Sequence, residues 1–222
     1  AAGSTLNING GTLNLSNGGT SAGALTGAGQ LNVTGGTLDV QGANSALTAG
    51  TNIATGATAS LNDVEGLGSS AITTNGTLAL NGTRGTLDNA IDGSGAVTLS
   101  NAADVILAGN NALSGSWNTA VGTRLTATQA SNLGTAAINN SGSFNVDSST
   151  DWTLANAVNG VGVLTKNGSG TLTIDRANSY SGGSTVSGGM LKLTNTEGAG
   201  TGTVNIDSGA ALELALTSAS VF

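Results

Sequence analysis

The chain has 222 residues, of which only 8% are charged and 2% aromatic; it contains 37 Gly and no Cys, His or Pro. The net charge of −7 leaves five basic residues, too few to follow a phosphate backbone, so nucleic acid is not expected as a partner. Without thiolate or imidazole groups there is no disulfide, no His-ligated metal and no Ser-His-Asp chemistry, and we expect no metal or other cofactor.

The two chain ends carry no recognisable targeting segment. The opening AAGSTLNING lacks the charged and apolar regions of a signal peptide, and no stretch approaches the ~20 apolar residues of a membrane span. Since Ala1 opens almost directly on a repeat, we expect a fragment of a longer chain. The final Phe222 is interpreted as coincidence, because ALELALTSASVF lacks the alternating strands of an outer-membrane barrel.

The predicted elements are short strands, each marked by two apolar residues at positions i and i+2 that share one face. Gly, Asn-Gly or Ser-Gly follows most pairs and supplies the backbone conformations that turns require. No window shows helical spacing over a length typical of helices, so almost no helix is expected. In chain order the pairs are Leu6 and Ile8, Leu13 and Leu15, Leu31 and Val33, Leu38 and Val40, Leu78 and Leu80, Val97 and Leu99, Val105 and Leu107, Phe144 and Val146, Leu172 and Ile174, Leu191 and Leu193, Val204 and Ile206, and Leu212 and Leu214.

A long internal repeat organises these strands. The stretches GAGQLNVTGGTLDV, GSGAVTLSNAADVIL and GVGVLTKNGSGTLTI begin at Gly27, Gly93 and Gly160, so the unit recurs at intervals of about 66 residues. We therefore interpret residues 1–222 as a single segment of similar units. Its sub-repeats are an incomplete one at 1–26 and three longer ones at 27–92, 93–159 and 160–222.

This repeat favours an all-β solenoid over a sandwich, because stacked coils repeat their sequence and sandwiches need not. With coils of about 22 residues, a repeat unit would form three coils and the chain about ten, stacked about 4.8 Å apart. Such a core is a narrow column that needs few apolar residues in each coil. Phe144 and Tyr180 align with leucines of neighbouring units and are expected inside it.

Residues 168–214 carry a more specific pattern of Gly, aliphatic residues and one Asn-x-Tyr-x-Gly element. It resembles the passenger-associated β-strand repeat of bacterial autotransporters, of the AIDA/pertactin-like kind. Arg176 stands where that family often has Gly. The residues on the family pattern are Gly170, Leu172, Ile174, Asn178, Tyr180, Gly182, Thr185, Val186, Gly189, Leu191, Val204, Gly209 and Leu212.

The resemblance implies a right-handed parallel β-helix in the passenger of a type V secretion system. It further implies export across the outer membrane of a Gram-negative bacterium and display on the cell surface, with release from the cell as an alternative. The tether would be a C-terminal β-barrel that this sequence does not include.

Three functional hypotheses follow. The first is a β-helical stalk and adhesin whose rows of Ser, Thr and Asn contact a second copy on another cell, giving aggregation, biofilm formation and a role in virulence, or contact surface glycans and proteins. The second is a non-binding spacer or autochaperone region that assists export and folding of a more distal domain. The third is a polysaccharide-acting enzyme, a class that also uses this fold.

The enzyme hypothesis has little support, and we expect no catalytic residues. Asp88 and Asp92 form one close acidic pair and Asp147 and Asp151 another, but Arg84 is the only basic residue near either. These acids are interpreted as solvated turn carboxylates.

Trp117 and Trp152 are the candidate contact residues. Their counterparts in the preceding unit are Thr51 and Gly85, which indicates positions outside the regular core. One interpretation therefore places each Trp at the surface or capping a coil, where an indole can stack on a sugar or a partner protein. The alternative is local packing under a loop.

Overall fold

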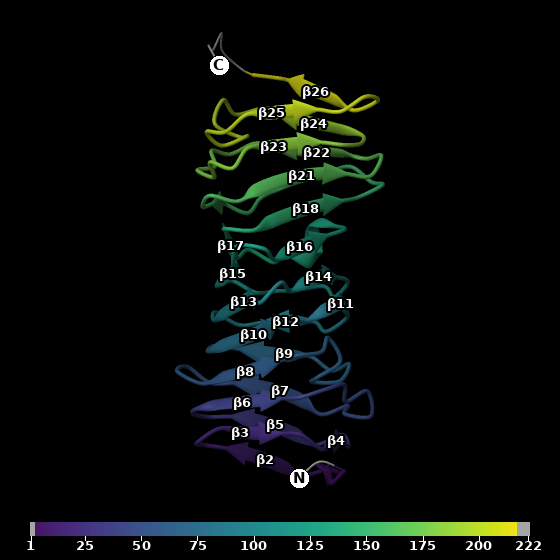
Figure 1. Ribbon diagram of the computed structural model, residues 1–222, viewed down its shortest axis with the longest axis vertical. Helices are drawn as coiled ribbons and strands as arrows, with labels where there is room; N and C mark the ends of the chain where they lie inside the picture. Colours follow the sequence, from purple (N-terminus) through teal and green to yellow (C-terminus); the bar gives the residue numbers. More distant parts are fainter. Residues whose placement is uncertain (1–2, 217–222) are drawn as a thin grey trace.

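The structure, a computed structural model, describes residues 3–216, which form a rod of parallel β-strands (Figure 1). It contains 26 strands in this range, and its one helical element there is a 3₁₀ turn, η1 (Ala130–Asn132). The coils number about ten and lie about 20 residues apart, which confirms the predicted parallel β-solenoid. This single turn of helix is far too short to cross a membrane. Phe222 lies outside the described range, so its interpretation stays a prediction.

The coils place strands on three faces of the rod. The first face begins with a two-stranded sheet, continues through loops and ends in a seven-stranded sheet. A parallel bridge between Gly27 and Leu47 connects the small sheet to those loops. The strands of this face are β1 (Thr5–Asn7), β4 (Ala24–Thr26), β11 (Arg84–Leu87), β14 (Asp104–Leu107), β16 (Arg124–Ala127), β18 (Ser143–Asp147), β21 (Val163–Asn167), β23 (Ser184–Val186) and β25 (Val204–Ile206).

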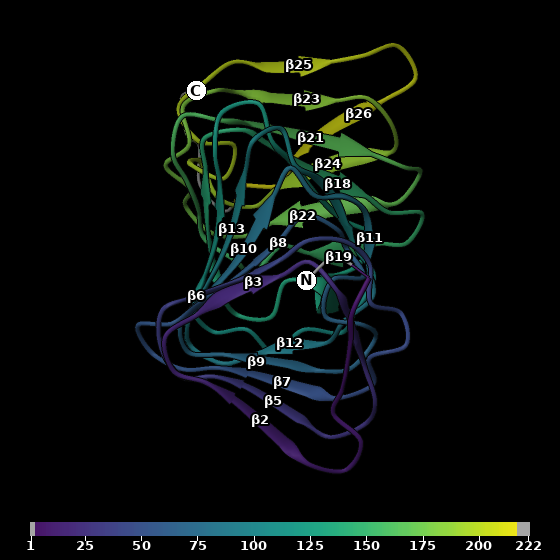
Figure 2. The ribbon, with the colours of Figure 1, turned by 60° about the horizontal axis from the view of Figure 1, so that its bottom comes forward.

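The second face holds a five-stranded and a four-stranded sheet, separated by loops near the middle of the rod. Figure 2 shows the lower five strands stacked on one side of the rod, apart from the strands of the third face. The strands are β2 (Thr12–Leu15), β5 (Gln30–Val33), β7 (Gly50–Ile53), β9 (Ile72–Thr74), β12 (Ile91–Asp92), β19 (Trp152–Thr153), β22 (Thr171–Ile174), β24 (Met190–Leu193) and β26 (Ala211–Leu214).

The third face is the longest continuous sheet, with eight strands and loops only in its last coils. It consists of β3 (Gly19–Ser21), β6 (Thr37–Val40), β8 (Thr58–Leu61), β10 (Thr77–Asn81), β13 (Ala96–Ser100), β15 (Ser116–Thr119), β17 (Ala137–Asn140) and β20 (Val158–Asn159).

The core is a column of inward side chains stacked on their equivalents in the next coil. On the third face Leu78 pairs with Val97, Val97 with Trp117 and Trp117 with Ile138, and all four are fully buried. The i, i+2 pattern produces this arrangement because alternate residues of a strand point to opposite sides of the sheet. Each coil therefore adds a few aliphatic contacts with its two neighbours, and stability accumulates along the rod.

The sequence repeat does not match a whole number of coils. Along the second face Asn32 pairs with Asn52, Asn52 with Thr73, and Thr73 with Asp92, so three coils take about 60 residues. Thr98, the counterpart of Asn32 in the next repeat unit, has already passed to the third face. Individual coils are thus about 20 residues long and shorter than expected. One repeat unit makes three coils and about a third of the next, and the prediction of three coils per unit is wrong.

As a result, equivalent segments of successive units lie on successive faces. Each unit has a pair of longer loops without strands, and this pair moves by one face from unit to unit. The loops are 41–49 and 62–71 on the first face, 108–115 and 128–136 on the second, and 175–183 and 194–203 on the third.

A buried Asn holds the first loop of each pair. The side-chain oxygen of Asn111 accepts a hydrogen bond from the backbone N–H of Ile91 in the coil below (2.7 Å). Its amide group donates to the carbonyl of Asn132 in the coil above (2.6 Å). Asn44 and Asn178 make the equivalent two bonds in the other units. These side chains replace strand hydrogen bonds where the chain leaves the sheet.

Candidate functional site

The outer surface of the third face is the largest regular surface of the rod. Its outward side chains stand in two columns that run along the axis from β6 towards β20, each residue in register with its neighbours. Asp39 is the only charged residue in them. The first column is Thr37, Thr58, Thr77, Ala96, Ser116 and Ala137; the second is Asp39, Ser60, Ala79, Thr98, Asn118, Asn139 and Asn159.

Side-chain amides form a ladder in the upper part of this surface. The amide of Asn139 donates to the side-chain oxygen of Asn118 (2.8 Å), and Asn118 donates to the hydroxyl of Ser116 (3.0 Å). One coil further along, the hydroxyl of Ser179 donates to the side-chain oxygen of Asn159 (2.9 Å). A carboxamide has two N–H donors and a two-lone-pair acceptor, so these bonds orient the groups without using their full capacity.

Charged side chains are concentrated on the other faces. On the first face Arg84, Asp104 and Arg124 form an outward column. The guanidinium of Arg124 binds the carboxylate of Asp104 through two hydrogen bonds, Nε to Oδ1 (2.7 Å) and Nη2 to Oδ2 (2.5 Å), which together with the opposite charge raise the pKa of Arg124. On the second face Lys192 pairs with Glu213 at 2.8 Å. The eight-stranded sheet of the third face is therefore the longest sheet whose outward columns bear a single charge, whereas the loops that follow it on this face carry Asp175, Arg176 and Glu197.

A shallow groove follows the corner between the third and first faces. It encloses about 600 Å³ and is lined by turns of successive coils. Val121, which is 80% exposed, projects here together with Val161 and Val163, and Arg84 and Arg124 border the groove. The exposed valines make this edge of the third face apolar.

The expected surface position of Trp117 is wrong. Its side chain is fully buried, because strand β15 places it inward between Val97 and Ile138. The indole N–H donates to the carbonyl of Leu133 at 3.0 Å. The comparison with Thr51 was misleading since Thr51 is itself an inward, buried residue. Trp117 is a core residue and cannot contact a glycan or a partner in the folded rod.

Trp152 lies half-buried in β19, where it pairs with Leu172 and packs against the core. Its indole nitrogen is enclosed and has no hydrogen-bond partner within residues 3–216. The side chain keeps some exposure to solvent, so a contact through Trp152 stays a prediction. Of the other aromatic side chains, Phe144 and Tyr180 are buried as predicted.

The acidic pairs lie on the outside of the rod. Asp88, Asp92, Asp147 and Asp151 are all exposed, and Asp151 accepts a hydrogen bond from the backbone N–H of Thr171 (2.6 Å). Over residues 3–216 no three acidic side chains gather in a way that could hold a metal ion. All four carboxylates face solvent as predicted, but only Asp88 and Asp151 lie between strands, whereas Asp92 and Asp147 are the last residues of β12 and β18.

Sequence reasoning missed one unusual residue. Lys166 occupies an inward position of β21 between Val146 and Val186, and its side chain is fully buried. Its ammonium donates to the carbonyls of Asn167 (2.5 Å), Gly168 (2.9 Å) and Gly188 (3.2 Å). Burial lowers the pKa of Lys166. The i, i+2 spacing from Leu164 was the signal that could have identified this position as inward.

Comparisons with known proteins agree with the repeat. Residues 164–193, which span β21 to β24, match the family described as passenger-associated-transport-repeat. Two Escherichia coli K12 proteins are similar: "uncharacterized protein YuaQ", 44% identical over 193 residues, and "uncharacterized lipoprotein YdeK", 34% identical over 191 residues. The matches cover 87% and 85% of this chain but 14% of each relative, so the chain spans about a seventh of their length. No solved structure matches.

The chain thus carries autotransporter passenger-like repeats within a parallel β-solenoid. A closer relation to the AIDA/pertactin-like group stays a prediction.

Proposed function

We propose that the chain is a surface-exposed segment of an autotransporter passenger, serving as a stiff stalk and as a self-association module. The passenger-associated-transport-repeat at 164–193 supports a passenger, and the lipoprotein name of one relative is consistent with a place at the cell envelope. The observation that carries the self-association role is the long third face with its neutral Thr, Ser, Ala and Asn columns.

Two copies of the third face have the same strand spacing along the rod axis. Strands of a parallel sheet recur about every 4.8 Å, and two copies of the same face share that spacing along their whole length. Small neutral side chains allow close approach, carry little charge to desolvate and do not repel one another. Each contact is weak, but many contacts on each rod, and many rods on each cell, add up through effective concentration.

A charge-complementation experiment tests this proposal. The chain is coupled at one terminus to beads, and bead clustering is measured for the wild type, Asn118→Glu and Asn118→Lys. Because a homotypic contact brings equivalent regions together, each variant alone should cluster at least tenfold less, whereas a mixture of Glu and Lys beads should cluster again. Asn145→Glu, outward on the first face, is the matched control and should cluster like the wild type.

Two results would overturn self-association through the third face. One is clustering of the Asn118 variants equal to that of the control. The other is no wild-type clustering at any bead density, with attachment instead to glycan-coated or protein-coated surfaces, which would make the partner heterologous.

The spacer and autochaperone role is the second candidate, favoured by the transport repeat that residues 164–193 match. If it is correct, replacing these residues in an exported passenger should lower the amount displayed. Clustering per displayed molecule should then not depend on Asn118.

We also propose that the chain has no catalytic role, since its acidic pairs are exposed on the outside of the rod and the ammonium that interacts with Asp147 and Asp151, that of Lys166, is buried and held by backbone carbonyls. Release of reducing ends from a panel of acidic and neutral polysaccharides, abolished by Asp88→Asn, would contradict this.

A further inference from the structure

The groove at the corner between the third and first faces gathers the exposed aliphatic side chains of the middle of the rod. Between residues 22 and 200 four large aliphatic side chains are exposed, and three of them, Val121, Val161 and Val163, line this groove. The fourth, Ile106, lies on β14, whose Asp104 also lines it. Complete coils lie below and above the groove, so these side chains belong to the outer surface of the rod.

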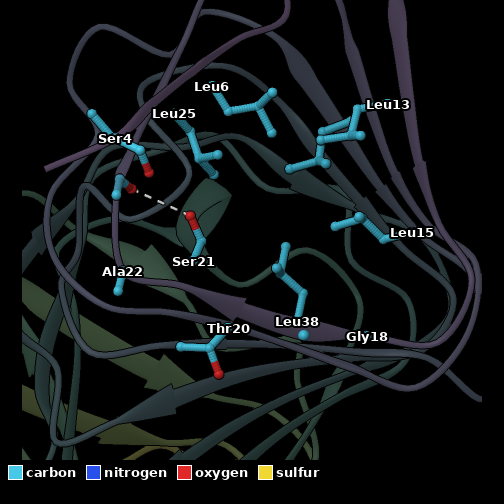
Figure 3. A pocket seen from close by; sticks show the side chains of 14 residues that line it. Ser4, Leu6, Leu13, Leu15, Gly18, Thr20, Ser21, Ala22, Leu25 and Leu38 are labelled. Carbon is cyan, nitrogen blue, oxygen red and sulfur yellow. Dashed lines mark hydrogen bonds between the residues drawn. The ribbon is translucent and has the colours of Figure 1, made fainter. Parts of the chain in front are cut away.

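The opening at the lower end of the rod is different in kind. Figure 3 shows Leu6, Leu13 and Leu25 around it. These leucines belong to the core column, since Leu6 pairs with Leu25 and Leu13 pairs with the buried Leu31. The valines of the corner groove, by contrast, are outward side chains of turns and of β21.

The groove carries positive charge towards its lower end. Five outward residues stand in register on successive strands of the first face: Arg84, Asp104, Arg124, Ser143 and Val163. This column spans four coil spacings, about 19 Å. Asp104 is bound to Arg124, and no carboxylate of residues 3–216 lies within ion-pair distance of the exposed Arg84. The groove therefore has one uncompensated guanidinium at one end and valines at the other.

From this polarity we propose that the groove binds an extended peptide segment of another protein, with a carboxylate near one end and aliphatic side chains towards the other. An extended chain rises about 3.4 Å per residue, so about six residues match the length of the column. The carboxylate binds the guanidinium of Arg84 through paired hydrogen bonds, a geometry that Arg favours. Aliphatic side chains at alternate positions face the same way and cover Val121 and Val161.

Charge complementarity favours an acidic segment although the net charge of the chain is −7. At physiological ionic strength charges more than about 8 Å apart are largely screened, so the nearest charges decide. Near the groove these are two guanidinium groups and one carboxylate, that of Asp104, which is already paired.

The lining of the groove favours a peptide over a sugar. A sugar ring is commonly held against an aromatic face, and the aromatic side chains within residues 3–216 lie elsewhere. Trp117, Phe144 and Tyr180 are buried in the core, and Trp152 belongs to the second face. Small residues such as Ala102 and Ser141 line the groove instead and allow a peptide backbone to approach closely.

A displayed library of random six-residue peptides tests this inference. Peptides selected on the wild-type chain should carry Asp or Glu near one end and aliphatic residues at alternate positions beyond it. One selected peptide is then synthesised, and its dissociation constant is measured by fluorescence anisotropy. Arg84→Gln should weaken binding at least tenfold, and Val161→Ser at least threefold, because each removes one of the two contacts on which the peptide depends.

Arg176→Gln and Ile106→Ser are the matched controls. Arg176 is exposed on loop 175–183 of the third face, and Ile106 is exposed but does not line the groove. Both variants should bind the peptide like the wild type, and thermal unfolding confirms that every variant is folded. Beads carrying Arg84→Gln should cluster like wild-type beads, so the peptide contact and third-face self-association can fail separately.

Three results would overturn the inference. The first is a selection that yields no peptide, or only peptides without a carboxylate. The second is binding that Arg84→Gln and Val161→Ser leave unchanged. The third is a different occupant: self-association in sedimentation velocity that Arg84→Gln abolishes would make it a second copy, and binding of polygalacturonate in place of peptides, lost in the same variant, would make it a glycan.

Discussion

Asn101 and Ala102 form a turn in which both residues have left-handed backbone conformations, with φ angles of 51° and 58°. Gly36, the counterpart of Ala102 in the preceding unit, has a similar φ of 66° and no β-carbon to crowd its backbone. Ala102 is exposed, so its methyl group gains little from packing.

We predict that Ala102→Gly stabilises the chain by about 0.5–1 kcal/mol, the relief of left-handed strain less the extra entropy of unfolded Gly. Ala120→Gly is the control, an exposed turn residue outside the left-handed region, and it should be neutral or destabilising. Denaturant unfolding measures both; a loss of stability in Ala102→Gly would show that its turn is unstrained.

Lys166 predicts an unusual pH dependence. Its pKa is lowered in the fold, so at intermediate pH the unfolded chain binds more protons than the folded one. Stability should therefore rise with pH from the lowered pKa up to about 10.4, the unfolded value. Lys166→Met removes this contribution, so the stability of the variant relative to that of the wild type should fall as pH rises through that range. A difference that does not change with pH would contradict the assignment.

At the scale of the single element, the buried Asn at the start of each first loop is the feature most open to test. Asn111→Ala leaves the N–H of Ile91 and the carbonyl of Asn132 without their partner. We expect a loss of about 2 kcal/mol or more in unfolding free energy. Asn110→Ala, next to it but exposed, should cost about 0.5 kcal/mol or less. Equal effects of the two variants would contradict the structural role of Asn111.

The strands themselves could be predicted, because the i, i+2 pairs need only local alternation to indicate an inward face. Alternation was less informative where an inward residue was polar or unusually large. Thr119 follows Trp117 at an inward position, and this pair was not recognised as a strand. Lys166 was missed for the same reason, since an ammonium in a core position requires carbonyl partners that only the folded turn supplies.

The candidate surface could be predicted in character but not in position. The shortage of charge already indicated neutral Ser, Thr and Asn columns. The face that holds the longest continuous sheet is set by the positions of the loop pairs, and these positions depend on the true coil length. The small difference between the expected and the observed coil length decides whether the loops stack on one face or move around the rod.

At the scale of the whole molecule, the loop pair shifts by one face from each repeat unit to the next, and this shift makes the three faces alike. Each face is interrupted by one loop pair over about ten coils, and none remains irregular throughout. Because every coil contacts only its neighbours, a loop on one face is supported by strands on the other two. The rod can thus carry its loops without losing continuity, as a stalk requires.

The central claim is that the chain forms a stack of coils in which one sequence unit makes three coils and about a third of a fourth. It is tested by distances between spin labels, which the absence of native Cys makes straightforward. Asn32→Cys with Asp92→Cys should give a backbone separation of about 14 Å, three coil spacings along one face. Asn32→Cys with Thr98→Cys should give a clearly longer distance. A shorter distance between positions 32 and 98 than between positions 32 and 92 would contradict the account.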